Sequence, residues 1–136
     1  MIGGLETRDH GAKRIMVVDD NADIRNLISL ILTSESYEVL TLESGTELLS
    51  RYASFQPHLV LLDIMMPHMS GFEVLEAVRS LEEENLNSIP IVMITAKSMD
   101  SDIDRALELG ATSYIVKPFR AEALKQKVFT HLNQKS

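Results

Sequence analysis

Two short apolar runs in this chain stop abruptly at carboxylates. Residues 15–18 are followed by Asp19 and Asp20, and residues 59–62 are followed by Asp63. A continuous apolar run of this length, unlike an alternating one, is typical of a strand buried on both faces of a parallel sheet. Two such strands lying side by side would bring all three carboxylates to one edge of the sheet.

Three carboxylates gathered in one place need a cation among them. Two like charges about 5 Å apart repel by roughly 3 kcal/mol at an effective dielectric constant of about 20. A hard divalent cation with oxygen ligands offsets this repulsion, and Mg²⁺ is the usual one where phosphate is handled. We therefore predict that Asp19, Asp20 and Asp63 form a site for Mg²⁺ (or Mn²⁺) and that its chemistry is phosphoryl transfer.

Strand-like and helix-like segments alternate along the chain from Lys13 onward. Five β-α repeats predict one α/β domain with a doubly wound parallel sheet and helices on both faces. The apolar runs predict five strands, at residues 15–18, 37–40, 59–62, 90–94 and 113–116. Helical spacing of apolar residues predicts five helices, at residues 22–32, 48–52, 74–81, 103–107 and 124–132, with a connector at 86–88.

The residues that end the other strands also have reactive side chains. Thr95 follows the fourth strand and Lys117 follows the fifth. The second strand, which we expect at the edge of the sheet, ends without a reactive group. Ligands of open parallel sheets bind outside the carboxyl ends of the strands, so we expect Thr95 and Lys117 to join the carboxylates.

The composition narrows the class of protein. With 136 residues, 45% of them hydrophobic and 24% charged, the chain matches one globular domain. Its 13 basic and 20 acidic residues give a net charge of -7 without a basic stripe, so we expect no direct nucleic-acid binding. It has no cysteine and no long apolar run, and we expect a cytoplasmic protein without a membrane segment. We expect a flexible extension at residues 1–12, the domain at 13–133 and a tail at 134–136.

Four segments of the chain carry a specific pattern. They are residues 17–20, 62–67 together with Gly71, 94–96 and 114–119. Together these segments resemble the receiver domain of two-component response regulators of the chemotaxis-regulator type, over residues 13–133. The resemblance implies strand order 2-1-3-4-5 in a flavodoxin-like three-layer sandwich.

The resemblance implies a role for the residues at the strand ends. Asp63 would be the phosphoacceptor, which takes a phosphoryl group from a sensor histidine kinase or a histidine phosphotransfer protein. Asp20 would bind Mg²⁺ directly, Asp19 largely through water, and Met65 through its backbone carbonyl. Lys117 would pair with Asp63 before phosphorylation and with a phosphoryl oxygen afterwards.

The resemblance also implies a switch. Thr95 would donate its hydroxyl to a phosphoryl oxygen, and the ring of Tyr114 would turn into the space that Thr95 leaves. The face formed by the fourth helix, fifth strand and fifth helix would then control an unknown protein target, so that the domain catalyses only its own phosphorylation and dephosphorylation. Met65 and Lys97 would set the lifetime of the acyl phosphate. The peptide bond after Lys117 would be cis. Whether the domain forms a homodimer through the switching face is left open by the sequence.

Plainer interpretations exist for each of these residues. Asp19 and Asp20 could cap the helix that follows them, where the helix dipole favours negative charge. Thr95 could be structural, Lys117 a solvated loop lysine, and Tyr114 a half-buried strand residue. These interpretations lose weight because the residues occur together in one pattern.

Two other metal motifs are incomplete. Residues 65–69, with three methionines and a histidine, could offer soft ligands to copper, but they fit the loop after the acceptor aspartate. Asp100, Asp102 and Asp104 resemble the opening of a calcium loop, but Arg105 stands where that loop requires glycine. We expect these acids at the start of the fourth helix instead.

Two rival functions are open. A magnesium-dependent phosphatase of the haloacid dehalogenase kind also forms an aspartyl phosphate on a parallel sheet. That class requires Asp-x-Asp after the first strand, whereas Asp19 and Asp20 are adjacent here. A degenerate receiver would act as a constitutive binding platform, although all five expected site residues are present.

Overall fold

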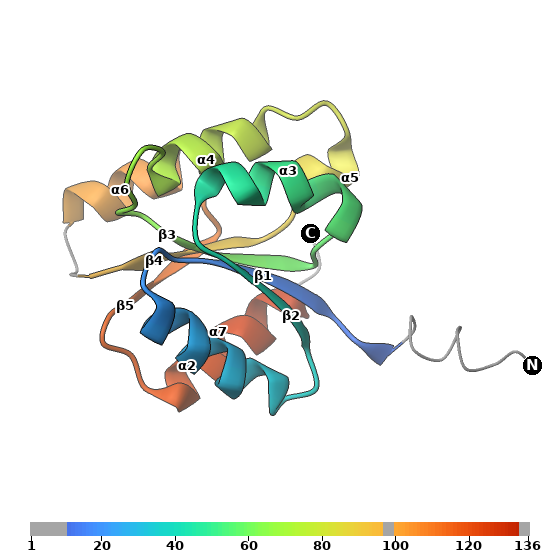
Figure 1. Ribbon diagram of the computed structural model, residues 1–136. Coiled ribbons are helices and arrows are strands. Elements are labelled where there is room, and N and C mark those ends of the chain that lie inside the picture. Colours follow the sequence, from blue (N-terminus) through green and yellow to red (C-terminus); the bar gives the residue numbers. More distant parts are fainter. Residues whose placement is uncertain (1–10, 97–99, 134–136) are drawn as a thin grey trace, which may run out of the picture.

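The computed structural model describes residues 11–96 and 100–133. Its centre is one sheet of five parallel strands in the order β2-β1-β3-β4-β5 (Figure 1). The central strand, β3, is buried along its whole length, as its continuous apolar run predicts. The strands are β1 (Arg14–Val18), β2 (Glu38–Leu42), β3 (Leu59–Asp63), β4 (Ile91–Thr95) and β5 (Ser113–Val116).

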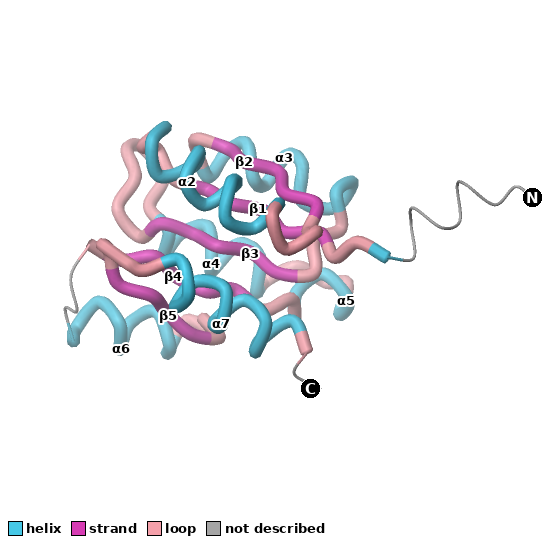
Figure 2. Tube along the Cα trace, turned by 90° about the horizontal axis from the view of Figure 1, so that it is seen from below, coloured by secondary structure: helices cyan, strands magenta, loops and turns pink. Residues whose placement is uncertain are grey.

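Six helices in the described residues cover the two faces of this sheet. They are α2 (Ala22–Thr33), α3 (Gly45–Phe55), α4 (Gly71–Arg79), α5 (Glu84–Asn87), α6 (Asp100–Glu108) and α7 (Ala121–Leu132). Helices α2 and α7 lie against one face, and α3, α4 and α6 lie against the other (Figure 1). Figure 2 shows α2 and α7 side by side in front of the sheet, so the domain has three layers.

The strands divide the hydrophobic core into two halves. In β1, Ile15 and Val17 pack with the apolar residues of α2 and α7. Met16 and Val18 pack with those of α3 and α4. Both faces of an inner strand are therefore apolar, which is why the strand has no alternating polar residues.

The predicted fold class, strand order and layers are confirmed. The second strand is shifted from the expected residues 37–40 to Glu38–Leu42, because it pairs residue for residue with all of β1. It lies at one edge of the sheet, as expected, and β5 forms the other edge.

The short helix α5 differs from the prediction. The sequence predicts a connector here and five helices in all, but Glu84–Asn87 form a single helical turn. No side chain caps the N-terminus of this turn. At its C-terminal end the hydroxyl of Ser88 donates to the carbonyl of Glu84 at 2.7 Å, and groups from other elements also hold it. The hydroxyl of Tyr52 donates to the carbonyl of Leu86 at 2.6 Å, and Arg79 donates to the carbonyl of Asn87 at 2.8 Å.

Some predictions concern residues that the structure does not describe. The expected extension is described only from Gly11 onward, and the expected tail and Lys97 lie outside the described residues. Among the described helices, none combines the length and the hydropathy that crossing a bilayer requires.

Candidate functional site

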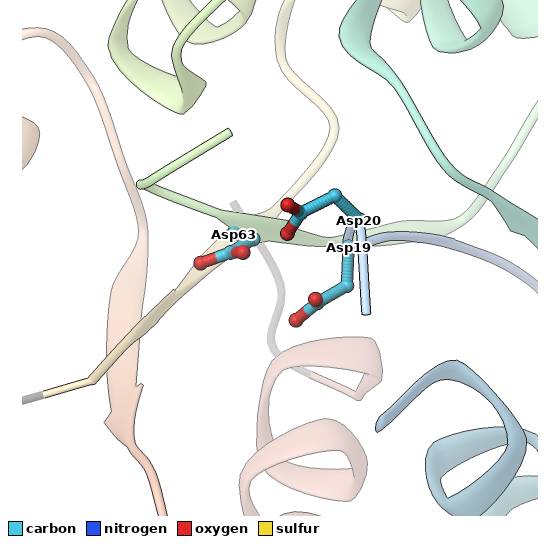
Figure 3. A group of neighbouring side chains, drawn as sticks. All are labelled: Asp19, Asp20 and Asp63. Atoms are coloured by element: carbon cyan, nitrogen blue, oxygen red, sulfur yellow. The ribbon is translucent and has the colours of Figure 1, made fainter. Parts of the chain in front are cut away.

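Asp19, Asp20 and Asp63 lie together at the carboxyl ends of two neighbouring strands (Figure 3). Asp63 is the last residue of β3, and Asp19 and Asp20 directly follow β1, which pairs with β3. Each carboxylate offers an oxygen, and these oxygens lie within 4.8 Å of one another. Asp19 is 0% and Asp63 4% exposed, whereas Asp20 faces solvent. The cluster is therefore buried on one side and open on the side of Asp20.

Asp19 is held by hydrogen bonds at its backbone and its side chain. Its N–H donates to the carbonyl of Leu42 in β2 at 3.2 Å. Its Oδ1 accepts from the N–H of Asn21 at 2.9 Å, and its carbonyl accepts from Nη1 of Arg25 at 2.7 Å. Within the described part of the chain, its buried Oδ2 accepts no hydrogen bond.

The ammonium group of Lys117 lies between two carboxylates. Its Nζ is 3.1 Å from Oδ2 of Asp19 and 3.8 Å from Oδ2 of Asp63. The lysine reaches this position because its N–H donates to the carbonyl of Thr95 at the end of β4, at 2.7 Å. The resemblance implies an ion pair between Lys117 and Asp63, but in the structure the shorter ion pair is with Asp19.

Burial and charge raise the pKa of Asp63 from 3.8 to about 7. Burial is the largest cause, because it disfavours the ionised form, and the negative charge of Asp19 adds to the shift. Lys117 lowers the pKa in part, as does the N–H of Met65, which lies 3.4 Å from Oδ1. With a pKa of about 7, the carboxyl of Asp63 is only partly ionised at neutral pH, and added positive charge would favour its ionised form.

The donor set fits a hard divalent cation. It consists of carboxylate oxygens on three residues. The buried Oδ2 of Asp19 accepts no hydrogen bond in the described part of the chain and has the ion pair with Lys117 as its polar contact there. Hard cations such as Mg²⁺ prefer oxygen ligands of this kind. The side chain of Met65 is 70% exposed, and its soft thioether is not a preferred ligand of a hard cation.

Thr95 and Tyr114 lie on the same face of the sheet. Strands β4 and β5 pair Met93 with Tyr114 and Thr95 with Val116. Because side chains alternate along a strand, Thr95 and Tyr114 both lie on the face of Met93, which packs with α3, α4 and α6. Thr95 is 4% exposed and Tyr114 is half-buried, so the two are diagonal neighbours in a packed layer.

Gly71 allows the loop after Asp63 to close tightly. Its N–H donates to the carbonyl of Ile64 at 2.9 Å. A Cβ on Gly71 would lie 2.9 Å from Cα of Ile64 and would overlap the carbonyl of Asp63. Helix α4 therefore begins directly against the backbone of Asp63. The expected cis peptide bond after Lys117 is present on the other side of the site.

The copper and calcium alternatives do not fit the structure. The side chain of Met65 is exposed, whereas Met66 and Met69 pack against the apolar core, so these thioethers do not converge. Asp102 and Asp104 lie within helix α6 and not in a loop.

The sequence reasoning missed two residues that shape the site. Arg25 hydrogen bonds to Asp19, and its one signal in the sequence is a cation near the start of a helix, where the dipole disfavours positive charge. Gly45 begins α3, and a Cβ there would lie 3.1 Å from Sδ of Met69 in the loop after Asp63. Its signal is a glycine inside a helical segment.

Residues 15–129 match the response regulator receiver domain family. The chain belongs to this family, as its motifs indicate. The DNA-binding response regulator MtrA of Mycolicibacterium paratuberculosis is 36% identical over 122 residues, which are 90% of this chain and 52% of MtrA. The probable transcriptional regulator ycf27 of Porphyridium aerugineum is 39% identical over 116 residues, which are 85% of this chain and 46% of that protein. The chain thus spans about half the length of these relatives.

Solved structures of receivers have the same fold. The chemotaxis protein CheY4 of Vibrio cholerae superposes with a TM-score of 0.83 at 30% identity, covering 89% of this chain and 99% of CheY4. The BeF3-activated N-terminal receiver domain of Klebsiella pneumoniae RstA gives a TM-score of 0.81 at 30% identity, covering 90% of this chain and 100% of that domain. The chain is therefore a receiver domain of two-component signalling with a CheY-like fold.

Proposed function

We propose that Asp63 accepts a phosphoryl group from a phosphohistidine, in a reaction that requires Mg²⁺ (or Mn²⁺). The donor would be a sensor histidine kinase or a histidine phosphotransfer protein. One observation carries this proposal: a buried carboxylate ends the central strand with two further carboxylates and a lysine directly around it. Receiver domains are signalling modules, so the chemistry would be confined to the domain's own phosphorylation and dephosphorylation.

The proposed reaction is a substitution at phosphorus. An ionised oxygen of Asp63 attacks the phosphorus atom, the phosphorus–nitrogen bond to the donor imidazole breaks, and the electron pair stays on the imidazole nitrogen. A carboxylate is a weak nucleophile, and positioning together with charge stabilisation is the main catalytic contribution that the site can make. Solvent reaches the cluster on the side of Asp20, which gives the donor a path of approach.

Each neighbour of Asp63 has a proposed task. Asp20, Asp19 and the carbonyl of Met65 would hold the divalent cation, which stabilises negative charge on the transferring group. Lys117, now shared between two carboxylates, would move to a phosphoryl oxygen. The hydroxyl of Thr95 would donate to another phosphoryl oxygen.

The switch would pass from Thr95 to Tyr114. Both side chains lie on one face of neighbouring strands, so a movement of Thr95 toward Asp63 changes the packing next to Tyr114. The ring would then turn inward and change the face formed by α6, β5 and α7, which would bind a protein target. Such a change is a population shift that needs a few kcal/mol of differential stabilisation.

Acetyl phosphate tests the proposed acceptor. Incubation with acetyl phosphate and Mg²⁺ should add the mass of one phosphoryl group to the wild-type protein and none to Asp63→Asn. Borohydride reduces an aspartyl phosphate to homoserine with release of phosphate, so peptide mapping of the reduced protein should find homoserine at the position of Asp63. If the wild-type protein gains no mass, the degenerate-receiver alternative replaces our proposal.

The phosphatase alternative has its own test. A phosphatase of the haloacid dehalogenase kind would turn over a small phosphate ester, would lose this activity in Asp19→Asn and would keep it in Asp63→Asn. Our proposal expects no sustained turnover in the wild-type protein and loss of phosphorylation in Asp63→Asn.

The names of two relatives describe them as a DNA-binding regulator and a probable transcriptional regulator. This chain corresponds to about half of each. For this chain, with its net charge of -7, we propose that the direct partners are proteins, namely the phosphodonor and the target. A second copy of the chain is a further candidate partner.

A further inference from the structure

Arg25 is a cation in an unfavourable position. It is the fourth residue of α2, where the positive end of the helix dipole disfavours a positive charge. In the described part of the chain, no carboxylate oxygen lies within 4.0 Å of its nitrogens. Its side chain is half-buried, and Nη1 donates to the carbonyl of Asp19 at 2.7 Å. The position of Arg25 is therefore explained by this carbonyl and not by an ion pair.

The carbonyl of Asp19 belongs to the peptide group that joins Asp19 to Asp20. Other groups already fix the rest of Asp19: its N–H bonds to Leu42, and its Oδ1 to the N–H of Asn21. The hydrogen bond from Arg25 fixes the plane of the next peptide group, from which the exposed Asp20 projects. The direction of the Asp20 carboxylate thus depends on a side chain that does not touch that carboxylate.

We propose that Arg25 is a positioning residue of the metal site. By holding the peptide group between Asp19 and Asp20, it orients the carboxylate of Asp20 toward Asp19 and Asp63, so that the three residues together bind one divalent cation. This inference rests on the proposed Mg²⁺ site. It adds a residue that binds neither the cation nor the phosphoryl group.

A role through charge and a role through positioning predict opposite changes in Mg²⁺ affinity when Arg25 is replaced. If only its positive charge affected the site, removing that charge would reduce repulsion of the cation, and Mg²⁺ would bind more tightly. If Arg25 positions Asp20, removing the guanidinium frees the peptide group and weakens Mg²⁺ binding. Groups that orient metal ligands typically change metal affinity by about 10–100-fold. Since Arg25 acts through the backbone, we expect the lower end, about 10-fold.

Calorimetric titration with MgCl₂ tests the proposal. Arg25→Met removes the donor and the charge, and Arg25→Lys keeps a donor that can reach the carbonyl. We expect the Kd for Mg²⁺ to rise about 10-fold in Arg25→Met and to be largely restored in Arg25→Lys. The control is Arg51→Met, an exposed arginine on α3, on the other side of the sheet; it should bind Mg²⁺ as the wild type does.

Thermal unfolding in EDTA separates positioning from simple support of the fold. If Arg25→Met lowers the Tm in EDTA but binds Mg²⁺ with the wild-type Kd, or more tightly, the proposal is wrong. If Arg25→Met does not fold, Arg25→Gln is measured instead, and a Kd for Mg²⁺ that equals the wild-type value or lies below it again shows that the proposal is wrong. A wild-type protein that binds no Mg²⁺ would overturn the proposed function itself, whereas an unchanged Kd in the folded variants overturns only the role of Arg25.

Discussion

At the scale of single residues, Asp63 has two opposing requirements. In the proposed reaction its carboxylate must be ionised to attack phosphorus, yet burial and the charge of Asp19 raise its pKa to about 7. Lys117, at 3.8 Å, compensates for only part of this. In the proposed reaction a bound cation would lower this pKa further, so that Asp63 would become a nucleophile once the cation is bound.

The raised pKa predicts how stability depends on pH in the metal-free protein. Since the pKa of Asp63 is higher in the folded state than the ordinary 3.8, folding favours the protonated form. Its contribution to stability is present below about pH 4 and is lost as the pH rises through about 7. Asp63→Asn has no such loss, so its Tm in EDTA should exceed that of the wild type by a few degrees at about pH 8 and by less at about pH 5.

Thermal melts at both pH values measure this difference. Asp104→Asn, an exposed aspartate on α6, serves as the control and should follow the wild type. Parallel pH profiles for the wild type and Asp63→Asn would contradict the raised pKa.

Gly71 is predicted to tolerate no side chain. Gly71→Ala places a methyl group against the backbone of Asp63 and Ile64, and backbone atoms cannot move aside as a flexible side chain can. We expect the free energy of unfolding to fall by about 1–3 kcal/mol, with slower phosphorylation because the acceptor moves. Urea denaturation measures the loss. Gly11→Ala has nothing within 4 Å of its new Cβ and should change little; equal losses in the two variants would refute the steric argument.

At the scale of elements, β5 and α7 meet at the ring of Tyr114. The ammonium group of Lys127, on α7, lies 5.8 Å from the centre of this ring. A cation over an aromatic face stabilises the pair by about 0.5–1 kcal/mol at exposed sites. The contact therefore favours the present orientation of the half-buried ring by this modest amount.

This contact predicts that Lys127 affects the proposed switch. Lys127→Met keeps the length of the side chain and removes the charge, so the ring should turn inward more often, by about two- to five-fold in population. The NMR resonances of the Tyr114 ring, with and without beryllofluoride, report this population. Lys125→Met is the control on the same helix, because Lys125 pairs with Glu35 and not with the ring. Unchanged Tyr114 resonances in Lys127→Met would show that the contact has no influence.

The helices and strands differ in how well the sequence predicts them. The apolar runs predict the inner strands well, because burial on both faces leaves a local signal, whereas the mixed edge strand β2 is predicted at shifted residues. Helix α5 leaves a weaker signal still: no side chain caps its N-terminus, and it depends on Tyr52 and Arg79 from distant positions. Lys117 is also only partly predictable. Its position at the end of a strand can be predicted, but its closer approach to Asp19 than to Asp63 depends on how far the side chain reaches across two strands.

At the scale of the whole molecule, the sheet acts as a rigid frame for the site. Strands that are far apart in the sequence end at one edge, so the positions of Asp19, Asp63, Thr95 and Lys117 follow from strand order and are predictable. Strand order itself came from the family resemblance. The supporting contacts of Arg25 and Gly45 were not predictable, because they depend on packing between neighbouring elements.

Mg²⁺ is predicted to stabilise the folded domain as a whole. A ligand that binds only the folded state raises the free energy of unfolding by about 1.4 kcal/mol at ten times its Kd. The Tm of the wild type should therefore rise with added MgCl₂, and that of Asp20→Asn should rise much less. Thermal melts over a range of MgCl₂ concentrations measure this. Asp104→Asn should respond as the wild type does, and an equal response of Asp20→Asn would exclude Asp20 as a ligand.

The position of α5 has a practical consequence. It precedes β4, so it lies at the rim opposite the reactive groups, which all follow or end their strands. The residues of the proposed site thus lie at one rim of the sheet, and α5 lies at the other. A reporter peptide spliced in at the exposed Glu82 would sit on the side of the frame that takes no part in the reaction.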